Sequence, residues 1–239
     1  NLTIINCTFL DNSAYGPNST GGAVYFNGGK LTVDNSKFDK NTAGFDGGAL
    51  YFKGEDGVIS RSNFTSNNAF YNGAVYMNSI GGTVDNCIFA NNVATNSSGA
   101  LGWVKKENGT IIGSKFINNS APRGGAIYLN NGTNFIIAWS KFENNTASLN
   151  GGAIYWDSGK EGIIISTSFI TNNATGNGGA IFFDGIDGKI GYRGHRARYR
   201  RGDKHGVRGK RGGQKLFEQI KQQLLVIQIS YYNLIHKKH

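Results

Sequence analysis

Aromatic side chains recur at one repeated position of this sequence, where they could stack against the rings of sugars. Each lies two residues after an alanine, and Gly102 takes the place of a seventh ring: Tyr25, Tyr51, Tyr76, Tyr128, Tyr155 and Phe182. An aromatic ring offers a large apolar face, and tyrosine adds a hydroxyl group, so a row of such rings is a candidate ligand-binding platform. The alternative is that the rings only stack on each other and stabilise the sheet that carries them.

Two carboxylates form the best candidate for acid–base chemistry. Asp34 and Asp85 each lie four residues before a repeated phenylalanine, and Ser60 holds the same position between them. Two strand spacings would separate them by about 9.6 Å, near the carboxylate separation of inverting glycoside hydrolases. Isolated carboxylates at turns are far commoner, and all four histidines lie after residue 194. We therefore expect a non-enzymatic protein, with a β-helix polysaccharide lyase or glycoside hydrolase as the alternative.

Metal and cofactor motifs are missing from the sequence. Asp and Asn oxygens suit calcium, but there is no EF-hand loop and no Gly-Gly-x-Gly-x-Asp repeat. We predict neither a metal nor a cofactor. Asn-x-Ser/Thr sequons such as Asn63-Phe64-Thr65 are abundant, and in a sequence this rich in Asn and Thr many arise from composition alone.

Two short motifs alternate seven times over residues 1–186 and must position these side chains. The first is Gly-Gly-Ala followed by an aliphatic residue, and its seven alanines are 25 to 27 residues apart. The second is Phe-x-x-Asn, with a branched aliphatic residue five positions before each phenylalanine and a small residue two positions before it. The seven phenylalanines are Phe9, Phe38, Phe64, Phe89, Phe116, Phe142 and Phe169.

The length and chemistry of this repeat predict an all-β protein, namely a right-handed parallel β-helix (solenoid) of about seven coils. Its apolar segments are short, β-branched or aromatic, and bounded by Gly and Asn, which is typical of strands. The leucine ladder of leucine-rich repeats is missing, and WD40 repeats are longer. We expect the Phe and aliphatic columns inside and the Gly pairs at turns with positive φ. The repeated Asn is expected at a corner, in left-handed geometry, bonding from coil to coil.

The two cysteines test this arrangement. Cys7 and Cys87 occupy the same small-residue position three coils apart, a separation of about 14 Å at one strand spacing per coil. A disulfide needs Cα atoms within about 7 Å. We therefore expect both thiols to be free and buried.

The charge of the chain is divided between two segments. Residues 1–186 carry 11 Lys and Arg against 12 Asp and Glu, whereas residues 187–239 carry 14 against 3. We therefore expect a β-helix domain at 1–186, for which no nucleic acid is predicted, and a basic tail at 187–239. The tail combines an Arg/Gly stretch with a possible amphipathic helix from Leu216 to Ile227. The Arg/Gly stretch could bind RNA or an anionic surface, and the helix could cap the open end of the solenoid. The third alternative, which the change in composition favours, is that the tail is a frameshifted or truncated gene end. No apolar stretch is long enough to span a membrane.

The alternation of Gly-Gly-Ala with Phe-x-x-Asn resembles the repeats of the chlamydial polymorphic outer membrane proteins and of archaeal adhesin-like surface proteins. All seven Phe-x-x-Asn copies match, while Asn72-Gly73-Ala74 and Ser98-Gly99-Ala100 lack the first glycine. The resemblance implies a cell-surface or secreted adhesin-like scaffold that binds extracellular glycans or surface proteins, with this chain a fragment of a longer protein. The six aromatic residues are then the expected ligand contacts.

Overall fold

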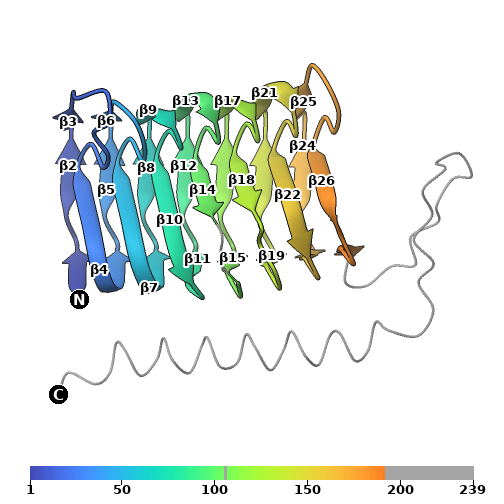
Figure 1. Ribbon diagram of the computed structural model, residues 1–239, viewed down its shortest axis with the longest axis horizontal. Helices are drawn as coiled ribbons and strands as arrows, with labels where there is room; N and C mark the ends of the chain where they lie inside the picture. The colour runs from blue at the N-terminus through green and yellow to red at the C-terminus, as the bar shows by residue number, and fades with distance from the viewer. Residues whose placement is uncertain (105–106, 192–239) are drawn as a thin grey trace, which may run out of the picture. The chain divides into compact units, whose positions relative to one another are not determined.

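A parallel β-solenoid is formed by residues 1–104 and 107–191, which are the residues that the computed structural model describes (Figure 1). Its strands form three sheets, two of seven strands and one of thirteen, and successive strands in each sheet come from successive coils. The strand pairs are parallel, as in the first coil of each sheet. The predicted all-β solenoid of about seven coils is confirmed. Its right-handed sense, which crossovers between parallel strands almost always adopt, stays a prediction.

The three sheets correspond to three segments of each coil. The thirteen-stranded sheet contains β1 Leu2–Ile5, β4 Val24–Asp34, β7 Leu50–Ser60, β10 Val75–Ile80, β11 Thr83–Asp85, β14 Leu101–Val104, β15 Thr110–Ile112, β18 Ile127–Asn130, β19 Ile136–Ala138, β22 Ile154–Lys160, β23 Ile163–Ile165, β26 Ile181–Ile186 and β27 Lys189–Gly191. The sheet that carries the repeated phenylalanines contains β2 Thr8–Leu10, β5 Lys37–Asp39, β8 Asn63–Thr65, β12 Ile88–Ala90, β16 Lys115–Ile117, β20 Lys141–Glu143 and β24 Ser168–Ile170. The third contains β3 Ser13–Ala14, β6 Thr42–Ala43, β9 Asn68–Tyr71, β13 Val93–Ser97, β17 Ser120–Arg123, β21 Thr146–Asn150 and β25 Asn173–Ala174.

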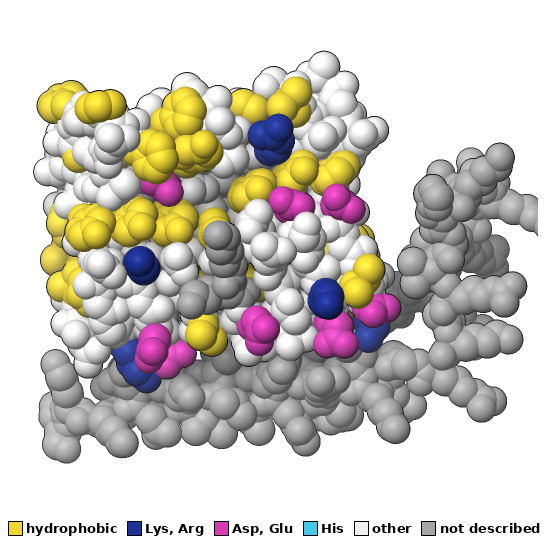
Figure 2. Space-filling model, viewed as in Figure 1, with side chains coloured by type: hydrophobic (Ala, Val, Ile, Leu, Met, Phe, Trp, Pro, Cys, Tyr) yellow, Lys and Arg dark blue, Asp and Glu magenta, His cyan; other side chains and the backbone are white. Residues whose placement is uncertain are grey.

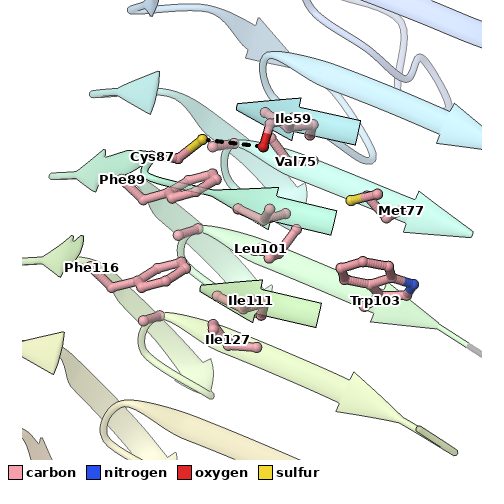
Figure 3. Packing of buried hydrophobic residues seen from close by; sticks show 14 of the residues in the cluster. Ile59, Val75, Met77, Cys87, Phe89, Leu101, Trp103, Ile111, Phe116 and Ile127 are labelled. Carbon is pink, nitrogen blue, oxygen red and sulfur yellow. Dashed lines mark hydrogen bonds between the residues drawn. The ribbon is translucent and has the colours of Figure 1, made fainter. Parts of the chain in front are cut away.

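Columns of identical side chains fill the interior. The phenylalanine rings of successive coils stack with centroids 4.6 to 4.9 Å apart, close to the spacing of paired strands. Phe89 and Phe116 lie one above the other beside the aliphatic column that contains Ile59 and Ile111 (Figure 3). Burying each such side chain contributes about 1.5–3 kcal/mol. The predicted core columns are confirmed.

The asparagines of Phe-x-x-Asn form a continuous hydrogen-bonded ladder. The Nδ2 group of Asn92 donates to Oδ1 of Asn119 at 3.0 Å, and the same oxygen accepts the backbone N–H of Asn92 at 3.0 Å. Asn92 Nδ2 also donates to the carbonyl of Phe64 in the preceding coil. The expected bonding from coil to coil is therefore present. The expected left-handed geometry is wrong, because the positive φ falls on the preceding residue, such as Asn91 (φ 57°) or Asn118 (φ 54°).

The two glycines of each pair meet different requirements. Gly47 has a positive φ of 61°, as expected, and its equivalents in two coils are Asn72 and Ser98. The second glycine, Gly48, is instead required by close packing, because a Cβ there would lie 2.1 Å from the carbonyl oxygen of Gly73 in the next coil. The expectation of positive φ is therefore correct for the first glycine and wrong for the second.

Both cysteines are free, as predicted. Cys87 is buried, and burial raises the pKa of its thiol to about 12. Its Sγ lies 3.5 Å from the carbonyl oxygen of Ile59 (Figure 3). Cys7 is only half-buried, contrary to expectation, because the adjacent strand β2 pairs on one side, with β5, among the described strands.

The last described strand, β27, pairs with β23 and ends five residues beyond the expected domain boundary at 186. The Arg/Gly stretch and the helix expected in the tail lie in residues 192–239, outside the described residues, so the division of the chain stays a prediction. Residues 1–104 and 107–191 contain no helix long and apolar enough to cross a membrane. In the same ranges no group of three or more His, Cys, Asp or Glu side chains is placed to hold a metal ion.

Candidate functional site

The six predicted aromatic residues lie in one outward-facing column, which we call the aromatic ladder. They occupy equivalent positions on β4, β7, β10, β18, β22 and β26. The residues on either side point inward: Val75 and Met77, which flank Tyr76, are completely buried. Figure 2 shows hydrophobic side chains in rows on the face that these strands form. The strand alternation expected from the sequence is therefore present.

The ladder consists of two stacks of three rings. Tyr25, Tyr51 and Tyr76 stack with centroids 5.1 and 4.7 Å apart. Tyr128, Tyr155 and Phe182 stack at 5.4 and 4.7 Å, and the interplanar angles throughout are 11 to 15°. Tyr25 is 57% exposed, and the other five rings are half-buried. Within each stack the rings therefore stabilise one another and still present their edges to solvent, so stacking and ligand contact are compatible.

Polar side chains two residues further along the strands border the ladder. Asn78 Nδ2 donates to the hydroxyl oxygen of Tyr76 at 3.2 Å, and Asn130 Nδ2 does the same for Tyr128. The Tyr128 hydroxyl donates to Asp157 Oδ2 at 3.3 Å. Aromatic faces beside amide and carboxylate groups are suited to polar ligands with an apolar ring face.

Burial moves the pKa of four tyrosine hydroxyls further above their ordinary value of 10. Burial raises the pKa of Tyr51 to about 12, and the neighbouring hydroxyl of Tyr76 and carboxylate of Asp46 contribute in the same direction. Burial also raises the pKa of Tyr76, Tyr128 and Tyr155. The hydroxyls of these four tyrosines are therefore neutral hydrogen-bond donors and acceptors.

Asp46 and Asn72 border the first stack and were missed from the sequence. Asp46 is 8% exposed, and its Oδ1 accepts a hydrogen bond of 2.8 Å from Asn72 Nδ2. Burial raises the pKa of Asp46 to about 7, against the opposing effect of the bonds from Asn72 and the Gly47 backbone. The available sequence signal was Asn72 itself, which replaces the first glycine of its pair.

The candidate catalytic carboxylates lie in one column but are already engaged. Asp34 and Asp85 both align with Ser60, on opposite sides of it. Ser60 Oγ donates to Asp34 Oδ1 at 2.7 Å, and Arg61 forms a salt bridge with Asp34 Oδ2. Burial raises the pKa of Asp85, whose Oδ1 accepts a bond from Asn86 Nδ2. Both oxygens of Asp34 therefore have partners within the protein.

An open pocket of about 310 Å³ lies beside this column, towards the first coils. It is lined by polar side chains that include Asn35, Lys37, Arg61 and Asn63, and by neither Asp34 nor Asp85. An inverting hydrolase requires two carboxylates that face each other across the substrate site. Asp34 and Asp85 do not face each other across this pocket.

Comparison with known families identifies the repeat. Residues 113–130 and 140–155 match the Chlamydia polymorphic membrane protein repeat. The matched segments contain two copies each of Phe-x-x-Asn and Gly-Gly-Ala. No curated protein and no solved structure matches the chain. Two segments of this β-solenoid are therefore similar to the Chlamydia polymorphic membrane protein repeat.

Proposed function

We propose that this chain is the presenting rod of an adhesin-like surface protein and that the aromatic ladder binds extracellular glycans. The observation that carries the proposal is the stacking of six outward-facing rings in two groups of three, on a face bordered by Asn78, Asn130 and Asp157. Sugar rings can lie against the exposed edges of the aromatic rings, or stack on the free ring faces at the ends of the two stacks, while the sugar hydroxyls bond to the bordering amides and carboxylates.

The matched repeat supports the surface location. It is a repeat of membrane proteins of Chlamydia, and polymorphic membrane protein repeats on a solenoid favour a surface scaffold of adhesin type over an enzyme. In that setting the solenoid holds its ligand groups at fixed spacings, because each coil is hydrogen-bonded to its neighbours.

The proposal is tested by removing one ring from each stack. We expect the double variant Tyr51→Ala/Tyr155→Ala to lose at least tenfold in affinity for the glycans that the parent chain binds on an oligosaccharide panel. The matched control is Tyr15→Ala, which removes a tyrosine that is 87% exposed and lies outside the ladder. Far-UV circular dichroism should show that all variants keep the fold.

Two results would contradict the proposal. Equal binding by the parent and the double variant would exclude the ladder as the glycan site. Binding of surface proteins, but of no glycan, by the parent would replace glycans with a protein ligand.

The alternative of a polysaccharide lyase or glycoside hydrolase predicts turnover of the panel that Asp85→Asn abolishes. The engaged oxygens of Asp34 favour the binding role.

A further inference from the structure

The aromatic ladder is interrupted at Gly102, between Tyr76 and Tyr128. In the strand register Gly102 pairs with Tyr76 on one side and with Tyr128 on the other. Two strand spacings, about 9–10 Å, therefore separate the two tyrosine positions. Among the described side chains, Tyr76 stacks on Tyr51 and Tyr128 stacks on Tyr155, so both rings turn one face towards the gap. We call this gap the Gly102 slot.

Asn72 forms the floor of the Gly102 slot. A Cβ built on Gly102 would lie 1.8 Å from Asn72 Oδ1, so this amide occupies the base of the position where other coils carry a ring. Two departures from the repeat are thus coupled in space: Asn72 replaces a glycine, and Gly102 replaces a tyrosine in the next coil. The Asn72 amide has room only because residue 102 is a glycine, since any side chain at this position would collide with the amide.

The floor contains an acceptor without a partner. Asn72 is 3% exposed, and its Nδ2 is held by Asp46 at 2.8 Å, which directs Oδ1 towards Gly102. Among the buried side-chain nitrogen and oxygen atoms of the described residues, Asn72 Oδ1 is the one that has no hydrogen-bond partner. Leaving such an atom unsatisfied costs about 1–3 kcal/mol, so the exception calls for an explanation, and a functional role is one of those known.

The walls of the slot are positioned by matching contacts. The Tyr76 hydroxyl accepts a bond from Asn78, and the Tyr128 hydroxyl accepts one from Asn130, each at 3.2 Å. These bonds anchor the hydroxyl end of each ring.

We propose that the Gly102 slot is a subsite for a single pyranose ring, which inserts between Tyr76 and Tyr128 and donates a hydroxyl hydrogen to Asn72 Oδ1. This proposal rests on the glycan-binding role of the ladder and names its most selective position. A ring midway between the two walls lies one strand spacing, about 4.8 Å, from each, similar to the ring spacings within the ladder.

The chemistry of the floor favours a sugar over an aromatic side chain. A phenyl ring would fit between the walls but has no donor for Asn72 Oδ1, whereas a pyranose has several hydroxyl groups. Because Asn72 Oδ1 is buried, a flanking ring must turn aside as the sugar enters. The slot therefore combines stacking with one directional hydrogen bond, which a ladder of uninterrupted rings does not offer.

The test closes the slot with residues that the chain already uses elsewhere. The double variant Asn72→Gly/Gly102→Tyr restores the glycine of Gly47 and Gly124 and the ring of Tyr51 and Tyr128. It should fold as the parent does and form seven stacked rings. We expect it to lose at least tenfold in affinity for the methyl glycosides of glucose, galactose and N-acetylglucosamine that the parent binds, measured by saturation-transfer NMR and isothermal titration calorimetry.

A second variant separates the slot from the ladder as a whole. Tyr25→Ala removes a ring at the end of the first stack, so it should weaken binding of long oligosaccharides more than binding of the methyl glycosides, whereas Tyr15→Ala, outside the ladder, should leave both unchanged. Methyl-glycoside binding that survives in Asn72→Gly/Gly102→Tyr overturns the slot and leaves the ladder standing. A parent chain that binds oligosaccharides but no methyl glycoside, or that takes up a phenylalanine peptide in their place, also overturns the assignment. Failure of the parent to bind either kind of sugar overturns both proposals.

Discussion

At the level of single side chains, Asp46 differs from the other acidic residues that the structure describes, because its carboxylate is buried. Its hydrogen-bond partners are the neutral amide of Asn72 and the Gly47 backbone, and burial raises its pKa to about 7. The neighbouring titratable groups are the hydroxyls of Tyr51 and Tyr76, which stay neutral in this range. Protonation of this one group is therefore coupled to folding near neutral pH.

We expect the free energy of unfolding to fall as the pH rises from about 4 to 7. The native state retains a proton on Asp46 in this interval while the unfolded state has released it, so the stabilisation is complete at low pH and is lost towards pH 7. A shift of three pKa units corresponds to a loss on the order of 4 kcal/mol. Urea unfolding at pH 4.5 and pH 8 measures it.

The matched variants for this measurement are Asp46→Asn and Asp11→Asn. Asp46→Asn keeps an oxygen for Asn72 and should flatten the pH dependence and raise the stability at pH 8. Asp11→Asn changes an exposed carboxylate and should leave the profile as in the parent. A profile in Asp46→Asn that follows the parent would exclude Asp46 as its source.

Close approach between coils governs the structure at the level of the elements. The strands of the three sheets repeat at one spacing only if the turns between them also stack. The second glycine of each pair makes this possible, since its missing side chain leaves room for a carbonyl of the next coil, as at Gly48 and Gly125. At the turns that follow the repeated phenylalanines, the asparagine ladder gives each buried side-chain amide a hydrogen-bond partner in the next coil.

Adding a methyl group at such a turn should disrupt the stacking. Gly48→Ala places a Cβ 2.1 Å from the backbone of Gly73, which cannot move without displacing its own coil. We expect a loss of about 1–3 kcal/mol or more in the free energy of unfolding, measured by urea denaturation. Gly191→Ala is the control, because a Cβ there meets no atom within 4 Å; a similar loss in both variants would refute the packing argument.

The whole solenoid depends on contacts between neighbouring coils. Each strand pairs with its counterparts in the coils before and after it, so stability is transmitted along the stack one coil at a time. The coils at the centre are supported from both sides, whereas β2 and β24 end their sheet within the described residues. The end coils should therefore open before the central ones.

The two cysteines report this difference directly. Cys87 is buried in the fourth coil, and Cys7 is half-buried in the first. We expect a thiol reagent to modify Cys7 within minutes in the native protein and Cys87 only on the timescale of central opening, followed by mass spectrometry. The Cys7→Ser variant isolates the Cys87 signal. Modification of both thiols at one rate would show that the coils open together.

How far the sequence predicts this structure depends on whether a feature repeats. The columns of Phe116 and its equivalents recur seven times, so their period alone defines the solenoid. The left-handed residue at Asn118 was misplaced by one position, because the ladder bond of Asn119 and the backbone turn are adjacent but separate. The contacts among Asp46, Asn72 and Gly102 were missed, because a repeat is defined by the residues that its copies share and these contacts depend on residues that differ between copies.

The contact between Asn72 and Gly102 has a consequence for how such genes change in length. Unequal recombination between similar repeats adds or removes one coil of about 26 residues. At most positions the coils on either side of the change still carry the same residue types, so their contacts are kept. Between Asn72 and Gly102 they are not: a coil inserted there would place a tyrosine against the Asn72 amide and leave Gly102 beside a glycine. We therefore expect insertions and deletions of whole coils to fall outside this pair of coils.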